Sequence, residues 1–239
     1  MNHAVRGARF KVAFLILFIS WFSPGCGGDG EQVVADLSVH FADARLEAAV
    51  REAVQKLSGS LFPWDLTGLA ALTAEDEEIA NLGGIEYCVN LTELDLSRNN
   101  IADIGPIRTL GKLTILELDD NSIVELDALE GISDLRNLLL RRNHILRIDA
   151  VADLTNLTLL ALGDNRISEI GPLGGLLVLT SLGLEDNEIE DIAPLAQNAA
   201  AGGLGTGDSV NLSGNPLSPP SVEALIPYLE GKGVAVTYP

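Results

Sequence analysis

Residues 91–110 read LTELDLSRNNIADIGPIRTL, and the same frame returns repeatedly along the chain. An asparagine marks each return at an interval of 22 residues: Asn99, Asn121, Asn143, Asn165 and Asn187. Seven apolar positions keep a constant spacing from each asparagine. So strict a period predicts equivalent units stacked one on another, and this repeat decides the fold.

Each unit begins with apolar residues that end in the two-residue alternation of a β-strand. Equivalent strands 22 residues apart stack in parallel if each turn of the chain returns on the other side of the core. The asparagine stands where the chain leaves the strand, so its amide can bond backbone groups that the turn would otherwise bury unpaired. We therefore expect the asparagines to be structural and the leucines to line one continuous core.

The frame resembles that of the leucine-rich repeat proteins, and the Ile-x-x-Ile-x-Pro-Leu after the asparagine resembles the 22-residue, internalin-like bacterial class. The resemblance implies the α/β class and a right-handed leucine-rich repeat solenoid, a horseshoe with a curved parallel β-sheet and an inner asparagine ladder. It also implies that the concave face binds another protein.

About seven units fill residues 69–217, of which the first and the last are degenerate. The first unit has Glu77 at the asparagine place and Cys88 at a core place. A glycine-rich insertion of six residues, 201–206, displaces the last unit. Cys26 and Cys88 are the two cysteines of the chain, which allows at most one disulfide. We expect Cys88 to be a buried structural thiol.

Residues 39–68 are expected to form a helical N-terminal cap, because an uncapped solenoid end exposes its core. Asp43 is the expected N-cap of the helix and Gly59 its stop signal. The apolar residues of one helical face are Leu46, Ala49, Val50, Ala53, Val54 and Leu57.

Residues 218–239 are expected to form a helix-strand C-terminal cap. Ser218-Pro219 is typical of an N-cap followed by the first helical residue. Pro227 should kink this helix, and Gly231 should end it. Apolar residues then alternate over residues 234–238, which predicts a short closing strand.

The first 25 residues have the pattern of a signal peptide. Arg6, Arg9 and Lys11 precede an apolar run over residues 12–22, which is too short for a permanent membrane span. Without these three basic residues the formal net charge changes from −19 to −22. Such a charge repels phosphate backbones and anionic lipid surfaces, so we expect no nucleic-acid partner.

Ser23-Pro24-Gly25-Cys26 resembles the cleavage box of bacterial lipoproteins, in which the cysteine carries the lipid. Cys26 is therefore the expected lipidation site, and residues 26–38 form the expected tether. The expected location is the bacterial cell envelope, membrane-anchored on its periplasmic or surface face. Ser23 departs from the aliphatic residue that the family prefers, which leaves cleavage without lipidation, and hence secretion, as the alternative.

The sequence lacks the residue patterns of an active site. Its histidines are His3, His40 and His144, and no phosphate loop, nucleophile elbow or metal-ligand spacing is present. We therefore expect no catalytic residues, no cofactor and no metal. Calcium at Asp119-Asp120 or Asp186 is the alternative to a solvated acidic surface, which we favour.

Alternation places the third, fifth and seventh residues of each unit on the outer, concave face of the sheet. The expected partner-binding residues are the acidic Glu93, Asp95, Glu117 and Asp119 of the N-terminal half and a central apolar patch of Ile115, Leu139, Leu159 and Ala161 beside Arg141. The repeat frame does not require aliphatic residues at these places, so the patch predicts an interface. The alternative is residual hydrophobicity that neighbouring side chains cover.

The strands offer a small area, about 500 Å², whereas a standard partner footprint is about 800 Å². The ligand is thus bound weakly, smaller than a domain, or also held outside the sheet. The favoured function is an exported, lipid-anchored, non-enzymatic monomer that binds a protein ligand. The alternatives are a passive structural or adhesive envelope component and, last, an unrecognised hydrolase.

Overall fold

The computed structural model describes residues 36–238, and the residues from Leu37 onward form one compact unit. The predicted signal peptide, Cys26 and nearly all of the predicted tether lie outside the described residues. In the part of the chain that is described, no helix has the length and apolar character needed to cross a bilayer.

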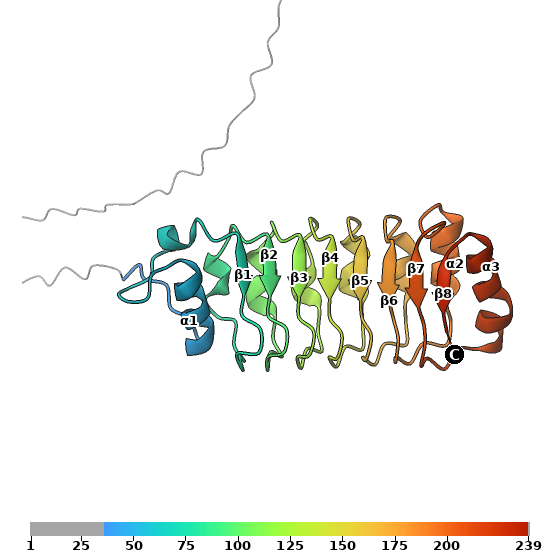
Figure 1. Ribbon diagram of the computed structural model, residues 1–239, viewed down its shortest axis with the longest axis horizontal. Helices are drawn as coiled ribbons and strands as arrows, with labels where there is room; N and C mark the ends of the chain where they lie inside the picture. The colour runs from blue at the N-terminus through green and yellow to red at the C-terminus, as the bar shows by residue number, and fades with distance from the viewer. Residues whose placement is uncertain (1–35, 239) are drawn as a thin grey trace, which may run out of the picture. The chain divides into compact units, whose positions relative to one another are not determined.

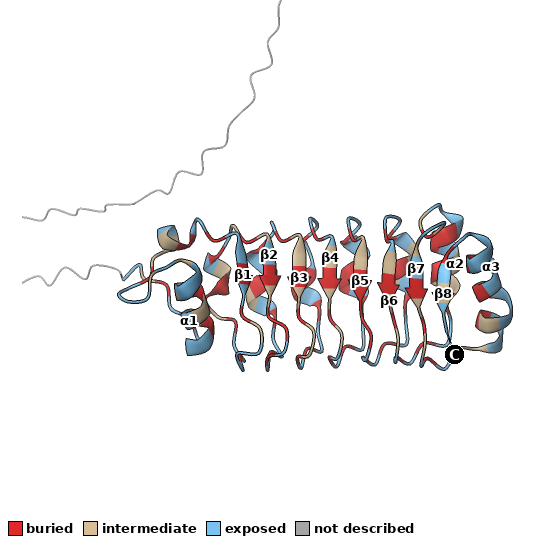
Figure 2. Cartoon of the chain, viewed as in Figure 1, coloured by how far each residue is buried: buried red, intermediate tan, exposed pale blue. Residues whose placement is uncertain are grey.

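Eight parallel strands form a single sheet in chain order, which confirms the predicted solenoid (Figure 1). Their bounds are β1 Ala71–Thr73, β2 Glu93–Asp95, β3 Ile115–Glu117, β4 Asn137–Leu139, β5 Leu159–Ala161, β6 Ser181–Gly183, β7 Ser209–Asn211 and β8 Ala235–Thr237. Equivalent residues pair across neighbouring units, as Leu94 with Leu116 and Leu116 with Leu138. The middle residue of each strand from β1 to β7 is buried, and its two neighbours are at least partly exposed, with the exception of the buried Ala161 (Figure 2).

The asparagine ladder is present as predicted. Asn143 Nδ2 donates to the carbonyl oxygens of Leu118 (3.0 Å) and Leu140 (3.1 Å), and its Oδ1 accepts from the backbone N–H of Ile123 (2.9 Å). Each amide therefore joins its own unit to the preceding one. The same bonds recur at Asn99, Asn121, Asn165, Asn187 and Asn215.

The residue before each asparagine adopts a left-handed backbone conformation, a feature that was not predicted from the sequence. The φ angles are 57° at Arg98, 55° at Asp120, 51° at Arg142, 56° at Asp164 and 52° at Asp186. This conformation costs a residue with a Cβ about 1–2 kcal/mol. The last unit has Gly214 at this place, where the cost disappears.

Behind the sheet, the core is closed by short 3₁₀-helices in five units: Ile85–Tyr87, Gly105–Thr109, Asp127–Leu129, Asp149–Asp153 and Gly171–Gly175. The unit with the insertion instead forms the helix α2, Ala193–Ala200. The buried Asn198 amide donates to the carbonyl of Leu173 and accepts from the N–H of Leu204, which holds the insertion against the core. Cys88 is buried as expected, and burial raises the pKa of its thiol to about 12.

The N-terminal cap contains the helix α1, Ala44–Ala53, and Asp43 is its N-cap, accepting from the N–H of Arg45 (2.9 Å). The expected stop at Gly59 is wrong, because the chain already turns at Gln55, with φ 56°. The N–H of residue 56 bonds the Arg51 carbonyl (2.9 Å), which closes the helix end. Two residues of the predicted helical face are exposed: Leu57 (77%), which lies beyond the end of the helix, and Ala53, the last residue of α1.

The C-terminal cap begins with helix at Pro219, as expected, and the Ser218 carbonyl accepts from the N–H of Val222 (3.1 Å). Before Pro227 the helix has a π-helical segment, Ser221–Leu225, and continues as α3, Ile226–Gly231. The predicted closing strand is β8, which pairs in parallel with β7.

Candidate binding site

The strand face, defined here as the outward-facing third and fifth residues of the units, carries most of the predicted partner-binding residues. Register places Glu93 beside Ile115, and Asp95 beside Glu117. Glu117 in turn pairs with Leu139. Asp119 and Arg141 lie just beyond the ends of β3 and β4. The structure thus brings the acidic residues and the apolar residues together on three consecutive strands, β2 to β4, and β5 extends the apolar part.

The strand-face patch consists of Ile115, Leu139 and Leu159, each of which is partly exposed. Ile115 and Leu159 flank Asn137 in register, and Leu139 lies two residues further along the strand of Asn137. These aliphatic side chains therefore surround one polar residue on the outer surface of the sheet.

The expectation that Ala161 belongs to the exposed patch is wrong, because Ala161 is only 1% exposed. Its short methyl group lies beside Leu139 in register. On its other side is Gly183, over which the carboxylate of Glu185 lies. The larger neighbours leave too little of Ala161 accessible for direct contact with a partner.

A polar network borders the patch at the ends of the strands. The Arg141 backbone N–H donates to Asp119 Oδ1 (2.7 Å), and Arg141 Nε lies 3.5 Å from Glu185 Oε1. Asn211 Nδ2 donates to Glu185 Oε2 (3.1 Å). The network extends over the units of β3 to β7 and holds Arg141 between two carboxylates.

The contribution of Glu185 to this network was not predicted from the sequence. Its signal was Gly163, the residue at the equivalent place of the preceding unit. A Cβ at Gly163 would overlap the Glu185 carboxylate. The glycine therefore provides the space in which Glu185 reaches back toward Arg141.

The acidic half of the strand face is electrostatically unfavourable. Burial raises the pKa of Glu117, and the nearby charges of Asp95, Asp119 and Glu75 raise it further. Burial also raises the pKa of Asp119, against the lowering by its hydrogen bond from Arg141. A bound positive charge would relieve this repulsion. Within residues 36–238, no group of three or more His, Cys, Asp or Glu residues is arranged to hold a metal ion.

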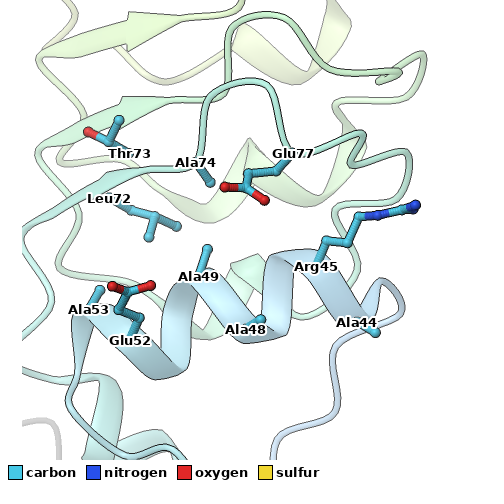
Figure 3. A pocket seen from close by; sticks show the side chains of 10 residues that line it. All are labelled: Ala44, Arg45, Ala48, Ala49, Glu52, Ala53, Leu72, Thr73, Ala74 and Glu77. Atoms are coloured by element: carbon cyan, nitrogen blue, oxygen red, sulfur yellow. The ribbon is translucent and has the colours of Figure 1, made fainter.

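A groove, called here the cap groove, lies between α1 and β1 and has a volume of ≈430 Å³ (Figure 3). Its lining includes Ala49 and Glu52 from the helix, Leu72 and Thr73 from the strand, and Glu77 from the following loop. Because Thr73 also belongs to the strand face, the groove adjoins the acidic half of that face. This groove was not predicted from the sequence.

Residues 89–131 match the family model described as "Leucine Rich repeats (2 copies)". An internalin C2 of Listeria monocytogenes has a similar structure, with 31% identity over 83% of this chain and 94% of that chain and a TM-score of 0.62. An internalin (inlF) of the same organism has 24% identity over 86% of this chain and 67% of that chain, with a TM-score of 0.64.

A leucine-rich repeat protein of Leptospira interrogans shares the fold at 22% identity and a TM-score of 0.60, over 72% of this chain and 49% of that chain. No curated protein matches the sequence. Both likenesses below 25% identity concern the fold alone.

Proposed function

The chain belongs to the internalin-like leucine-rich repeat proteins, and from this premise we propose that it binds a partner protein through the strand face without being an enzyme. The bound protein would bury the patch of Ile115, Leu139 and Leu159, and the acidic residues and the Arg141 network would surround the contact. This arrangement of an apolar centre and a polar rim is typical of protein interfaces.

The observation that carries the proposal is the partly exposed patch itself. Equivalent places of other units hold polar residues, such as Glu93 and Ser181 in the third place and Asp95 in the fifth. These units form the same strands with the same register, so the fold does not require aliphatic side chains there. Partly exposed aliphatic residues that the fold does not need are best explained by a partner that covers them.

Leu139→Glu tests the proposal. We expect the thermal melt to shift by about 2 °C or less, because surface substitutions change stability by about 0.5 kcal/mol, while capture of the partner from the native cell envelope is lost. Leu146→Glu is the matched control, since it makes the same substitution at a leucine that is 50% exposed and lies outside the strand face. Undiminished capture by folded Leu139→Glu would refute strand-face binding and favour the rigid-spacer alternative.

We further propose that residues 1–25 export the chain and that Cys26 carries a lipid which anchors it to the envelope. The basic and apolar pattern of residues 6–22 and the cleavage box before Cys26 support this proposal. Cys26→Ser should move the protein from the membrane fraction to the soluble exported fraction and abolish incorporation of radiolabelled fatty acid. Unlabelled wild-type protein would exclude the anchor and leave a secreted form.

A further inference from the structure

The cap groove exists because α1 packs through two large residues and leaves small ones beside them. Leu46 and Val50 are fully buried, whereas Ala49, on the adjoining part of the helix, is only partly covered. Figure 3 shows Ala49 pointing toward Leu72 and Ala74 across the groove. The helix of the opposite cap, α3, contains no alanine and buries Ile226 and Leu229.

Two carboxylates face the groove from opposite walls: Glu52 on α1 and Glu77 on the loop after β1 (Figure 3). Among the described residues, neither side chain has an ion pair or a hydrogen bond. The cation of the groove, Arg45, is already paired with Glu78, at 2.6 Å. The groove thus combines an apolar floor with two exposed carboxylates at its margin that have no counter-ion among the described residues.

These properties fit a side chain with an apolar stem and a positively charged end. The methylene groups of lysine or arginine cover apolar surface while the charged end remains near water or a counter-ion. An aliphatic side chain would leave the carboxylates uncompensated, and an acidic one would be repelled by them. Charge complementarity therefore selects a basic residue as the occupant.

The groove is continuous with the strand face through one row of residues. In register this row runs Thr73, Asp95, Glu117 and Leu139. Three strand spacings of about 4.8 Å separate Thr73 from Leu139, a distance that about four or five residues of extended chain cover. The acidic members of the row lie between the groove and the patch.

We propose that the cap groove binds a lysine or arginine side chain on an extended segment of the partner, about five residues from the aliphatic side chain that covers the patch. The inference rests on the proposed function of the strand face and specifies the chemistry of its partner. It also extends the contact beyond the small area of the sheet.

The inference can be tested with peptides in place of the partner protein. Binders are selected from a random 16-residue peptide library, with residues 37–239, which form one compact unit, as the target. Selected peptides should share an aliphatic residue and a lysine or arginine about five residues apart. The tightest of them, synthesised with a fluorophore, should bind Glu52→Gln/Glu77→Gln at least tenfold more weakly by fluorescence polarisation. Ala49→Leu, which fills the groove, should weaken it similarly.

Glu130→Gln/Asp134→Asn is the matched control, since it removes the same charge from exposed residues outside the groove and the strand face. Three results would each overturn the proposal that the groove binds a basic side chain. They are unchanged affinity of the folded groove variants, an equal loss of affinity in the control, and a library that yields no binding peptide. A peptide whose affinity is unchanged in the groove variants but lost in Leu139→Glu would overturn the groove proposal and support the proposed function of the strand face.

Discussion

The inner and outer faces of the sheet consist of alternate residues of the same strands, yet they obey different constraints. On the inner face, leucine stands at the middle of all strands from β1 to β6. On the outer face, the third place changes from Glu93 to Ile115, Asn137 and Leu159 in four consecutive units. The fold thus determines one face and leaves the other free, so the outer face is where this chain differs from a generic repeat.

One unit contains both a buried asparagine, in the turn after the strand, and an asparagine on the outer face of the sheet, which makes the comparison direct. Asn143 is buried, and its amide bonds the backbone of two units. Asn137 is partly exposed, and its Oδ1 accepts a long hydrogen bond (3.4 Å) from Thr158 Oγ1. The same side chain therefore has a structural role where it is buried in the turn and an exposed position on the outer face.

Asn143→Ala should be the most damaging change in this comparison. It leaves the buried N–H of Ile123 and the carbonyls of Leu118 and Leu140 without their partners, and each buried group left unpaired costs about 1–3 kcal/mol. We expect the free energy of unfolding in urea to fall by about 3 kcal/mol or more. Asn137→Ala should change it by about 0.5 kcal/mol or less.

The dependence of the unfolding free energy on urea concentration should also be compared between the two variants. If the solenoid unfolds separately on the two sides of the altered unit, the unfolding transition becomes broader. Equal losses for Asn137→Ala and Asn143→Ala would mean that the ladder bonds contribute no more than surface contacts. That result would remove the distinction between the buried and the exposed asparagine.

The repeated features were predictable because the same residue pattern recurs in several units of the sequence. Strand positions, the parallel order and the asparagine ladder all follow from one 22-residue period. The left-handed conformation before the asparagines was not predicted, because the five residues at this place are of two kinds: three aspartates, which tolerate the conformation, and Arg98 and Arg142, which do not favour it. The early end of α1 at Gln55 escaped prediction for the same reason, because the sequence suggested Gly59.

For the candidate site, the alternation of inward and outward residues along each strand was the only feature of the sequence that allowed a prediction. Alternation assigns Ile115, Leu139 and Leu159 to the outer face, but it says nothing of side-chain size around them, so the burial of Ala161 was missed. The cap groove depends on how α1 packs against β1. No periodic pattern encodes that contact, and the alanines of the helix are equally typical of any stable helix.

The two faces also differ in electrostatics, and Glu117→Gln measures this smaller effect. The pKa of Glu117 is raised by burial and by its acidic neighbours, so the native state holds the proton more tightly than the unfolded chain does. Stability from this group therefore falls as pH rises from the ordinary glutamate value through the raised one, and stays low above it. Glu117→Gln should stabilise the protein at pH 7 by about 0.5 kcal/mol or less, given solvent screening.

The gain should vanish near pH 4 and shrink in high salt, in urea titrations with Glu130→Gln as the exposed control. A gain that grew as pH fell would show that Glu117 is stabilised as an anion, and that the acidic half of the outer face carries no unfavourable charge.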